Sequence, residues 1–332
     1  MKAVTLNFTT SSKLKLEDVP VRPLENGEVL VAIKAAALNH RDEWCRQGLY
    51  PNINEGVILG SDGSGIVEEV AEGIDLGWIG KEVIINPAIN WGEDQKVQSK
   101  DFQILGMPRN GTLAEKVIVS VDRLHLKPKH LSFEEAGALP LAGLTAFRAL
   151  FYQGQLKSNE KVLITGFGGG VAQFAFQFAK AAGAKVYASS SSEEKRNVAK
   201  ELGAISVYDY TKEDWVENAL KESEGFDLII DSAAGDALNN LINVVKPGGK
   251  IVFYGATRGN PSTLIARKVF WNQIKIIGTT MGSDQDFEEM VSFIKDHEIK
   301  PIIDHVFTFE QAEEAFDRMK AGKQLGKIVL TP

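Results

Sequence analysis

The sequence contains a single cysteine, Cys45, among 332 residues. One thiol excludes an internal disulfide and every metal cluster built from several cysteines, and it is typical of a protein kept in a reducing compartment. No apolar run approaches the roughly 18 residues that a membrane-spanning helix needs. The chain turns polar at Thr9–Ser12 where a secretory signal would have its apolar core, so we expect a cytoplasmic protein that does not bind membranes.

Positive charge is also scarce, because 37 Lys and Arg stand against 44 Asp and Glu and give a net charge of -7. An acidic chain has no electrostatic reason to bind nucleic acid or an anionic membrane, so we expect small-molecule partners. The sequence is nevertheless 44% hydrophobic, with 17 Phe. This length and composition predict two folded domains of roughly 150 residues each.

From about Leu131 onward, short apolar runs alternate with segments of helical periodicity, which is typical of parallel βαβ units. Six strands separated by helices predict an α/β fold with a doubly wound parallel sheet of the Rossmann type. The expected strands are 161–165, 185–189, 207–208, 226–231, 251–254 and 274–278. The expected helices are 171–182, a helix with Ser191 and Glu194 in capping-box spacing, 213–222 and 236–245.

The first 125 residues contain short β-like runs such as 28–33 and 65–70, which indicates a second, mostly β domain. A helix over 309–321 and a strand over 326–330 end the chain, and that strand needs a sheet to join. We interpret the polar segment 91–109 as a surface loop. The sequence therefore predicts a β domain made of 1–128 and 283–332, and a dinucleotide-binding domain made of 129–282.

A glycine-rich turn connects the strand 161–165 to the following helix. A turn in this position presents unpaired N–H groups and the positive end of a helix dipole to a diphosphate. Glycine permits tight turning and close backbone approach, and a small residue lets the helix pack on the sheet. The residues expected to contact the coenzyme here are Gly166, Gly168, Gly169, Gly170, Val171 and Ala172.

The end of the second strand of such a sheet usually decides coenzyme choice, because a carboxylate there binds the ribose 2′-hydroxyl of NAD(H). This chain has four serines instead, which favours the 2′-phosphate of NADP(H). NAD(H) is the alternative if the serines only cap the next helix. The further residues expected to bind the coenzyme are Ser189, Ser190, Ser192, Lys195, Tyr210 and Gly255.

Several ordered motifs along the chain resemble the medium-chain dehydrogenase/reductase superfamily, and most closely its zinc-lacking, quinone oxidoreductase-like branch. The resemblance implies a GroES-like catalytic domain built from both termini, a Rossmann domain between them, and a cleft where substrate meets nicotinamide. The matching motifs are Ala37–Asp42, Gly48–Pro51, Leu59–Val67, Leu139–Ala146, the glycine turn, Pro247–Gly249 and Gly326–Ile328.

Zinc-dependent members of this superfamily hold a catalytic zinc ion at three positions that the resemblance assigns to Asn39, Ser61 and Ala142. None of these residue types is a normal zinc ligand. A shift of one residue would bring in His40 and Asp62, which still make an incomplete site. We therefore expect no metal.

Without a Lewis acid, oxidation of an alcohol is difficult, whereas a quinone or an α,β-unsaturated carbonyl delocalises the charge that an incoming hydride brings. The sequence therefore favours hydride transfer from NADPH to such an acceptor. The resemblance places Asn39, Trp44, Tyr50 and Thr145 around the reacting groups. In that arrangement the Asn39 amide lies near the nicotinamide, Tyr50 donates a hydrogen bond or a proton, Trp44 shapes the pocket and Thr145 contacts the nicotinamide.

Two other functions stay open at this stage. One is an alcohol or aldehyde dehydrogenase of the same superfamily, and the other is a non-catalytic NADPH-binding protein. The family commonly dimerises through its nucleotide-binding sheet, so the resemblance implies a homodimer or homotetramer that pairs along the strand 274–278.

Overall fold

The computed structural model describes all 332 residues, and they form two compact units. The first unit contains residues 1–144 and 282–332, and the second contains residues 145–281. The structure thus places the first boundary after Leu144, later than the expected boundary after residue 128. The reason is α2 (Phe133–Gly137), which packs on strands of the first unit and whose Gly137 lies against the backbone of Ala35.

The second unit is a six-stranded sheet in which every neighbouring pair of strands is parallel. Its strand order is β12-β11-β10-β13-β14-β15, so the chain reverses direction across the sheet between β10 and β13. This is the Rossmann order, and ligands bind at the carboxyl edge beside such a reversal. The strands are β10 (Lys161–Ile164), β11 (Lys185–Ser189), β12 (Val207–Tyr208), β13 (Phe226–Asp231), β14 (Val245–Phe253) and β15 (Lys275–Gly278).

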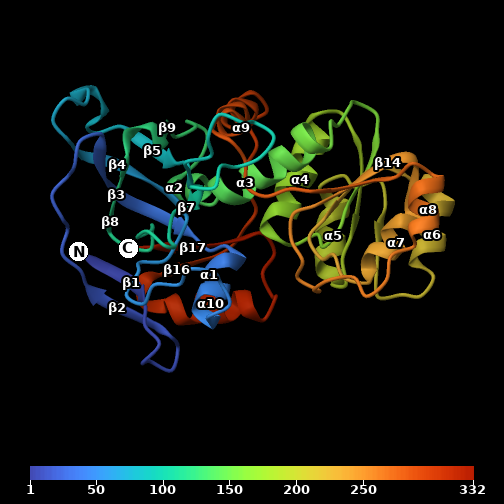
Figure 1. Ribbon diagram of the computed structural model, residues 1–332, viewed down its shortest axis with the longest axis horizontal. Helices are drawn as coiled ribbons and strands as arrows, with labels where there is room; N and C mark the ends of the chain where they lie inside the picture. The colour runs from blue at the N-terminus through green and yellow to red at the C-terminus, as the bar shows by residue number, and fades with distance from the viewer. The chain divides into compact units, whose positions relative to one another are not determined.

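Helices cover both faces of this sheet, with α4 and α5 on one side and α6, α7 and α8 on the other (Figure 1). The apolar periodicity explains the placement of α4, because this helix buries Phe174 and Phe178 at four-residue spacing and exposes Lys180. The expected helices are confirmed to within a few residues. Their bounds are α4 (Gly170–Ala181), α5 (Glu193–Glu201), α6 (Trp215–Ser223) and α7 (Ala237–Val244). The structure adds a short helix that was not expected, α8 (Ala266–Trp271), and a π-helical segment, η3 (Arg148–Gln153), which precedes β10.

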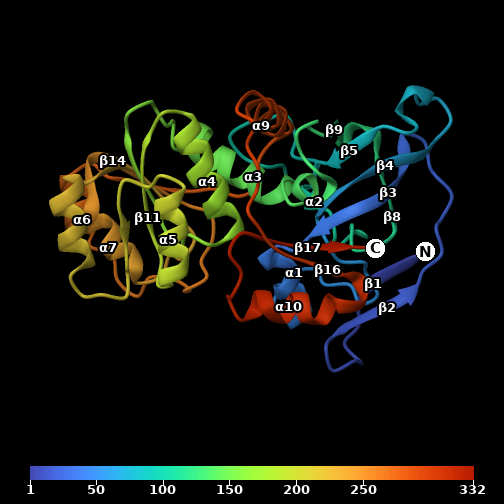
Figure 2. The same cartoon turned by 180° about the vertical axis from the view of Figure 1, so that it is seen from behind.

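The first unit is built on a seven-stranded, mostly antiparallel sheet. Its order is β16-β17-β3-β4-β5-β9, with β8 also paired to β3. The terminal strand β17 (Lys327–Thr331) lies between β16 (Ile303–Thr308) and β3 (Glu28–Ala37), so the prediction that it joins the N-terminal domain is confirmed (Figure 2). The other strands of the sheet are β4 (Asp62–Val70), β5 (Glu82–Ile85), β8 (Lys116–Ser120) and β9 (Leu124–Leu126).

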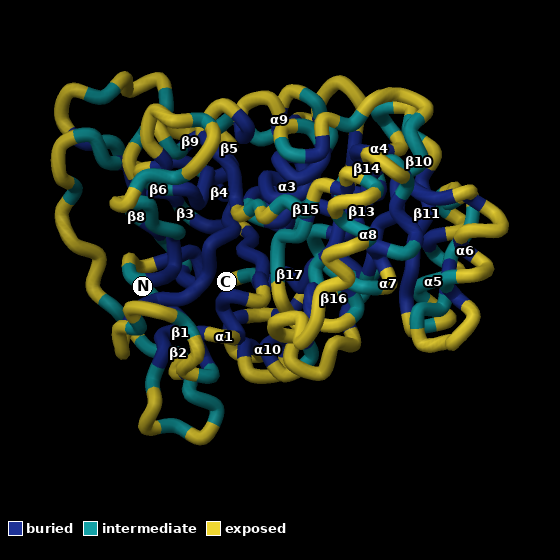
Figure 3. Tube along the Cα trace, turned by 45° about the vertical axis from the view of Figure 1, so that its right-hand side comes forward, coloured by how far each residue is buried: buried dark blue, intermediate teal, exposed yellow.

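Two small hairpins and a few helices complete the first unit. The hairpins pair β1 (Lys2–Leu6) with β2 (Leu14–Asp18) and β6 (Ala88–Ile89) with β7 (Gln103–Ile104). The remaining helices are α1 (His40–Gln47), α3 (Pro140–Phe147, which spans the unit boundary), α9 (Asp284–Asp296) and α10 (Ala312–Lys320), with short 3₁₀ turns η1 (Leu76–Trp78), η2 (Val121–Arg123) and η4 (Phe309–Gln311). Buried backbone is concentrated along the central strands of each unit (Figure 3).

The segment 91–109 differs from the expected surface loop. Trp91, Leu105 and Met107 are almost fully buried, and β7 within the segment pairs with β6. The charged residues that flank these three made the whole segment appear exposed in the sequence. None of the helices combines the length and the apolar character needed to cross a bilayer.

Candidate functional site

The glycine turn lies at the carboxyl end of β10, beside the point where the sheet reverses direction. Gly166 and Gly168 have φ angles of 61° and 121°; both lie in the region that favours glycine, and side chains rarely adopt the second. The N–H of Phe167 donates to the carbonyl of Ser189 over 2.9 Å, which fixes the turn to the end of β11. Gly169 then caps α4, whose 12 residues begin at Gly170. The N-terminus of α4 thus lies at the usual position of a coenzyme diphosphate.

The serine run follows β11 at the same edge. Ser189 and Ser190 are buried, while Ser191 is exposed and its Oγ accepts a hydrogen bond from the Tyr210 hydroxyl over 3.1 Å. The helix cap differs from the expected Ser191–Glu194 box, because Ser192 is the N-cap of α5 and its Oγ accepts from the N–H of Lys195. Ser192 therefore already has a structural partner, and Ser191 is the more accessible hydroxyl.

Two loops on the other side of the glycine turn complete this edge. Asp231, at the end of β13, accepts hydrogen bonds from the Thr165 hydroxyl and from the N–H groups of Ala233 and Ala234. Gly255 follows β14, and a methyl group in its place would lie 3.0 Å from the carbonyl oxygen of Ser232. Asp231 thus organises the backbone here, a role that its position after a strand suggested but that the sequence analysis did not assign.

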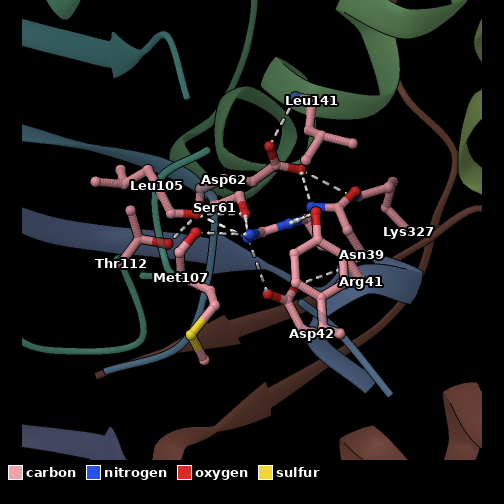
Figure 4. Close-up of polar contacts among 11 residues, drawn as sticks. Asn39, Arg41, Asp42, Ser61, Asp62, Leu105, Met107, Thr112, Leu141 and Lys327 are labelled. Atoms are coloured by element: carbon pink, nitrogen blue, oxygen red, sulfur yellow. Dashed lines mark hydrogen bonds and ion pairs between the residues drawn. The ribbon is translucent and has the colours of Figure 1, made fainter. Parts of the chain in front are cut away.

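In the first unit, three buried polar side chains meet where β3, β4 and β17 lie side by side (Figure 4). The Lys327 ammonium donates to Asn39 Oδ1 over 2.7 Å and to Asp62 Oδ2 over 2.8 Å. Asn39 Nδ2 donates to the same Asp62 oxygen over 2.9 Å. Asp62 Oδ1 accepts from the N–H of Leu141 at the start of α3. Asp62 is fully buried and Lys327 is only 2% exposed, so this Asn39–Asp62–Lys327 network is an internal charged pair bridged by an amide.

A second buried cation lies next to this network, on α1. The Arg41 guanidinium donates to Ser61 Oγ over 2.6 Å and to the carbonyl oxygens of Leu105 and Met107. Ser61 in turn donates to the Leu105 carbonyl over 2.7 Å. These contacts explain why the segment 91–109 is buried at its end. The Ser61 hydroxyl therefore both accepts a hydrogen bond, from Arg41, and donates one, to Leu105.

The α1 helix positions the remaining side chains of this region. Asn39 is its N-cap, and the Asp42 carboxylate accepts the backbone N–H of Asn39 over 2.8 Å. Burial raises the pKa of Asp42, whose other oxygen has no hydrogen-bond partner. Tyr50 follows the helix, with its hydroxyl 3.4 Å from Arg41 Nε and its ring 4.9 Å from the guanidinium carbon. Trp44 is exposed and meets the edge of the His40 ring.

The three positions that correspond to zinc ligands carry an amide, a hydroxyl and a methyl group, which do not fit the metal. Asn39 and Ser61 are held by Lys327 and Arg41, and Ala142 is buried in α3. The Asn39 amide oxygen and the Ser61 hydroxyl oxygen already accept hydrogen bonds from Lys327 and Arg41, which occupy the atoms that a metal would need. No group of three or more His, Cys, Asp or Glu side chains able to hold a metal occurs in the structure.

The structure brings the expected site residues together in two groups. The first group belongs to α1 and its ends in the first unit: Asn39 precedes the helix, Trp44 lies in it and Tyr50 follows it. The second group is Thr145 alone, a buried residue of α3 and the first residue of the second unit. No role was predicted for Lys327, although it lies in the terminal motif Gly326–Ile328. A lysine followed directly by the apolar run Ile328–Leu330 was the available signal, because such a strand places its residues in the core.

The fold and the glycine turn define a dinucleotide-binding oxidoreductase. Comparison with known families gives two matches: residues 25–129 match the alcohol dehydrogenase GroES-like domain, and residues 170–296 match the zinc-binding dehydrogenase domain. A zinc-type alcohol dehydrogenase-like protein of Leptosphaeria maculans is 36% identical over 91% of this chain and 90% of its own length. The chain therefore belongs to the medium-chain dehydrogenase/reductase superfamily.

Two further similarities extend over the whole chain. The crystal structure of an NAD-dependent alcohol dehydrogenase superposes with a TM-score of 0.95 at 35% identity and covers all of both chains. An acryloyl-coenzyme A reductase of Sulfurisphaera tokodaii is 30% identical over 96% of both chains. The same fold thus accompanies different substrates among its relatives, so the substrate has to be inferred from the site.

Proposed function

We propose that this protein is a metal-free reductase that transfers a hydride from NADPH to a quinone or an α,β-unsaturated carbonyl compound. The observation that carries the proposal is the buried Asn39–Asp62–Lys327 network, which includes one of the positions that the family resemblance assigns to a zinc ligand. The Lys327 ammonium is paired with Asp62 and also bonds to the Asn39 amide oxygen, so the network fixes an amide hydrogen-bond donor where the resemblance expects a metal ligand. An acceptor whose own conjugated system delocalises charge suits such a site better than an alcohol does.

The coenzyme fits the second unit. The turn from Gly166 to Gly169 and the start of α4 would bind the diphosphate, and the exposed Ser191 hydroxyl, Lys195 and Tyr210 would favour a 2′-phosphate on the adenosine ribose. Arg196 forms an ion pair with Asp209 over 3.2 Å, which neutralises the nearby carboxylate. When bound, NADPH supplies the hydride.

Reduction of an enone places the hydride on the β-carbon, moves negative charge onto the carbonyl oxygen, and ends with a proton on the α-carbon. The Asn39 amide nitrogen carries two hydrogens and donates one of them to Asp62, which leaves the other for the carbonyl oxygen. The Lys327 ammonium, bonded to the amide oxygen, polarises this donor further. The Tyr50 hydroxyl accepts from Arg41 and so keeps its own hydrogen to donate.

A panel of quinones, enones and aldehydes with NADPH or NADH tests the proposal. We expect NADPH oxidation with the conjugated acceptors and little with simple aldehydes. Asn39→Ala and Tyr50→Phe should lower kcat by about ten-fold to a hundred-fold while the Kd for NADPH changes little, since each removes one donor to the developing charge. Tyr152→Phe is the matched control, because Tyr152 also lies against an arginine, Arg148, but on η3 of the second unit.

Two results of this panel would contradict the proposal. Efficient turnover of simple alcohols and aldehydes would favour an alcohol dehydrogenase, the activity that the names of several relatives carry. Tight NADPH binding without turnover of any acceptor would favour a coenzyme-binding protein that is not an enzyme.

We further propose that the protein acts as a homodimer or homotetramer. β15 is an edge strand of the six-stranded sheet: one of its sides pairs with β14, and the other side pairs with no strand. The adjoining α8 exposes Phe270 and Trp271, at 67% and 78%. Pairing of two such edges satisfies the free backbone groups and covers these aromatic side chains.

A further inference from the structure

Three basic side chains lie near the carboxyl edge of the second unit's sheet, and the structure separates their roles. Arg196 bonds to the carbonyl of Ser190 over 2.9 Å and pairs with Asp209, so it is a structural group. Lys195 extends over the glycine turn: a methyl group in place of Gly168 would clash with its chain and lie 3.2 Å from its Nζ. The third basic residue, Arg258, was not expected from the sequence.

Arg258 reaches this edge from the far side of the sheet. It follows β14, and its N–H donates to the carbonyl of Ala233 over 3.0 Å, which ties its loop to the loop after β13. Its guanidinium carbon lies 5.6 Å from the centre of the Tyr210 ring. Tyr210 follows β12, and three strands separate β12 from β14. The contact between Arg258 and Tyr210 therefore spans the carboxyl edge above the centre of the sheet.

The hydroxyl groups beside this contact are arranged for an anion. Tyr210 donates to Ser191 Oγ, so the hydrogen of Ser191 is left to donate to a further acceptor. Arg258 is exposed, and its guanidinium faces an aromatic ring rather than a carboxylate. A planar guanidinium binds a phosphate group through two parallel hydrogen bonds.

We propose that Arg258 is a coenzyme-specificity residue that binds the 2′-phosphate of NADPH, together with Lys195 and the hydroxyl of Ser191. This inference rests on the proposed preference for NADPH. Arg258 would hold the phosphate from the loop after β14, and Lys195 and Ser191 would hold it from the segment after β11. The coenzyme preference of this chain thus depends on a residue far in sequence from the serine run.

Adenosine 2′,5′-bisphosphate and 5′-AMP separate the 2′-phosphate from the rest of the coenzyme, so their Kd values can be compared by calorimetry on the full-length protein. We expect Arg258→Gln to weaken binding of the bisphosphate by about ten-fold or more, as the loss of a hydrogen bond to a charged group does. Binding of 5′-AMP should change less than about two-fold. Arg258→Lys should retain part of the affinity, because it keeps the charge but loses the planar pair of donors.

Arg267→Gln is the matched control, since it removes the same charge from an exposed position on α8 of the same unit. An equal loss of affinity for both ligands in Arg258→Gln would assign the residue to the adenine ring and overturn the proposed phosphate contact. Wild-type discrimination that survives in Arg258→Gln would overturn this inference alone. If the wild-type protein binds the two ligands equally, the preference for NADPH fails as well.

Discussion

Replacement of Lys327 by methionine tests the buried Asn39–Asp62–Lys327 network, because methionine has a similar length and no charge. Asp62 is fully buried, and the variant leaves its carboxylate with hydrogen bonds from the Asn39 amide and the Leu141 N–H but without a cation. Loss of one member of a buried ion pair costs about 3–5 kcal/mol of unfolding free energy, whereas an exposed pair contributes about 0–1 kcal/mol. We therefore expect Lys327→Met to be severely destabilised.

Urea unfolding of the wild-type protein, Lys327→Met, Asp62→Asn and the double variant measures this coupling. The double variant removes both charges, so its free energy of unfolding should exceed that expected from the sum of the two single changes by about 1–3 kcal/mol. A loss below about 1 kcal/mol in Lys327→Met, or strictly additive effects, would refute the argument that Lys327 neutralises Asp62 inside the core.

Three further predictions concern other parts of the molecule. Burial, and then the charge of Arg123, lower the pKa of His125 to about 4, so between about pH 6.5 and 4 only the unfolded chain binds this proton. The free energy of unfolding should therefore fall by about 2 kcal/mol from pH 7.5 to pH 5. A His125→Gln variant should lack this pH-dependent loss in urea unfolding. Gly168→Ala places a side chain at φ 121°, so thermal unfolding should show a loss of about 1–3 kcal/mol of unfolding free energy. Gly169→Ala, at φ -77°, should show no such loss. Equal losses in the two variants would argue against backbone strain. Replacing Phe270 and Trp271 by serine should shift the protein toward monomer in sedimentation velocity, and an unchanged mass would count against pairing along β15.

The Rossmann unit could be read from the sequence because each of its elements has one clear period. The parallel strands are buried on both faces and appear as continuous apolar runs, and the helix after Gly170 carries Phe174 and Phe178 on one face. The exact capping serine could not be predicted, because Ser191 and Ser192 have the same chemistry and differ only in backbone position.

The candidate site could be predicted only in part, because its polar contacts join residues far apart in the chain. Asn39 and Lys327 lie 288 residues apart, and only the pairing of β17 with β3 brings them together. Arg41 likewise depends on two carbonyl groups from a segment whose surrounding residues are polar. Local periodicity carries no information about such contacts. Motif positions located Asn39, but its partners required the structure.

Hydride transfer to a conjugated acceptor without a metal can be tested directly by one measurement. Enzyme treated with a strong chelator and freed of metal by desalting is assayed for NADPH oxidation with a quinone and an enone, and its zinc content is determined in the same sample. We predict full activity at a zinc content far below one ion per chain. Activity that is lost with the metal and restored by added zinc would contradict the account.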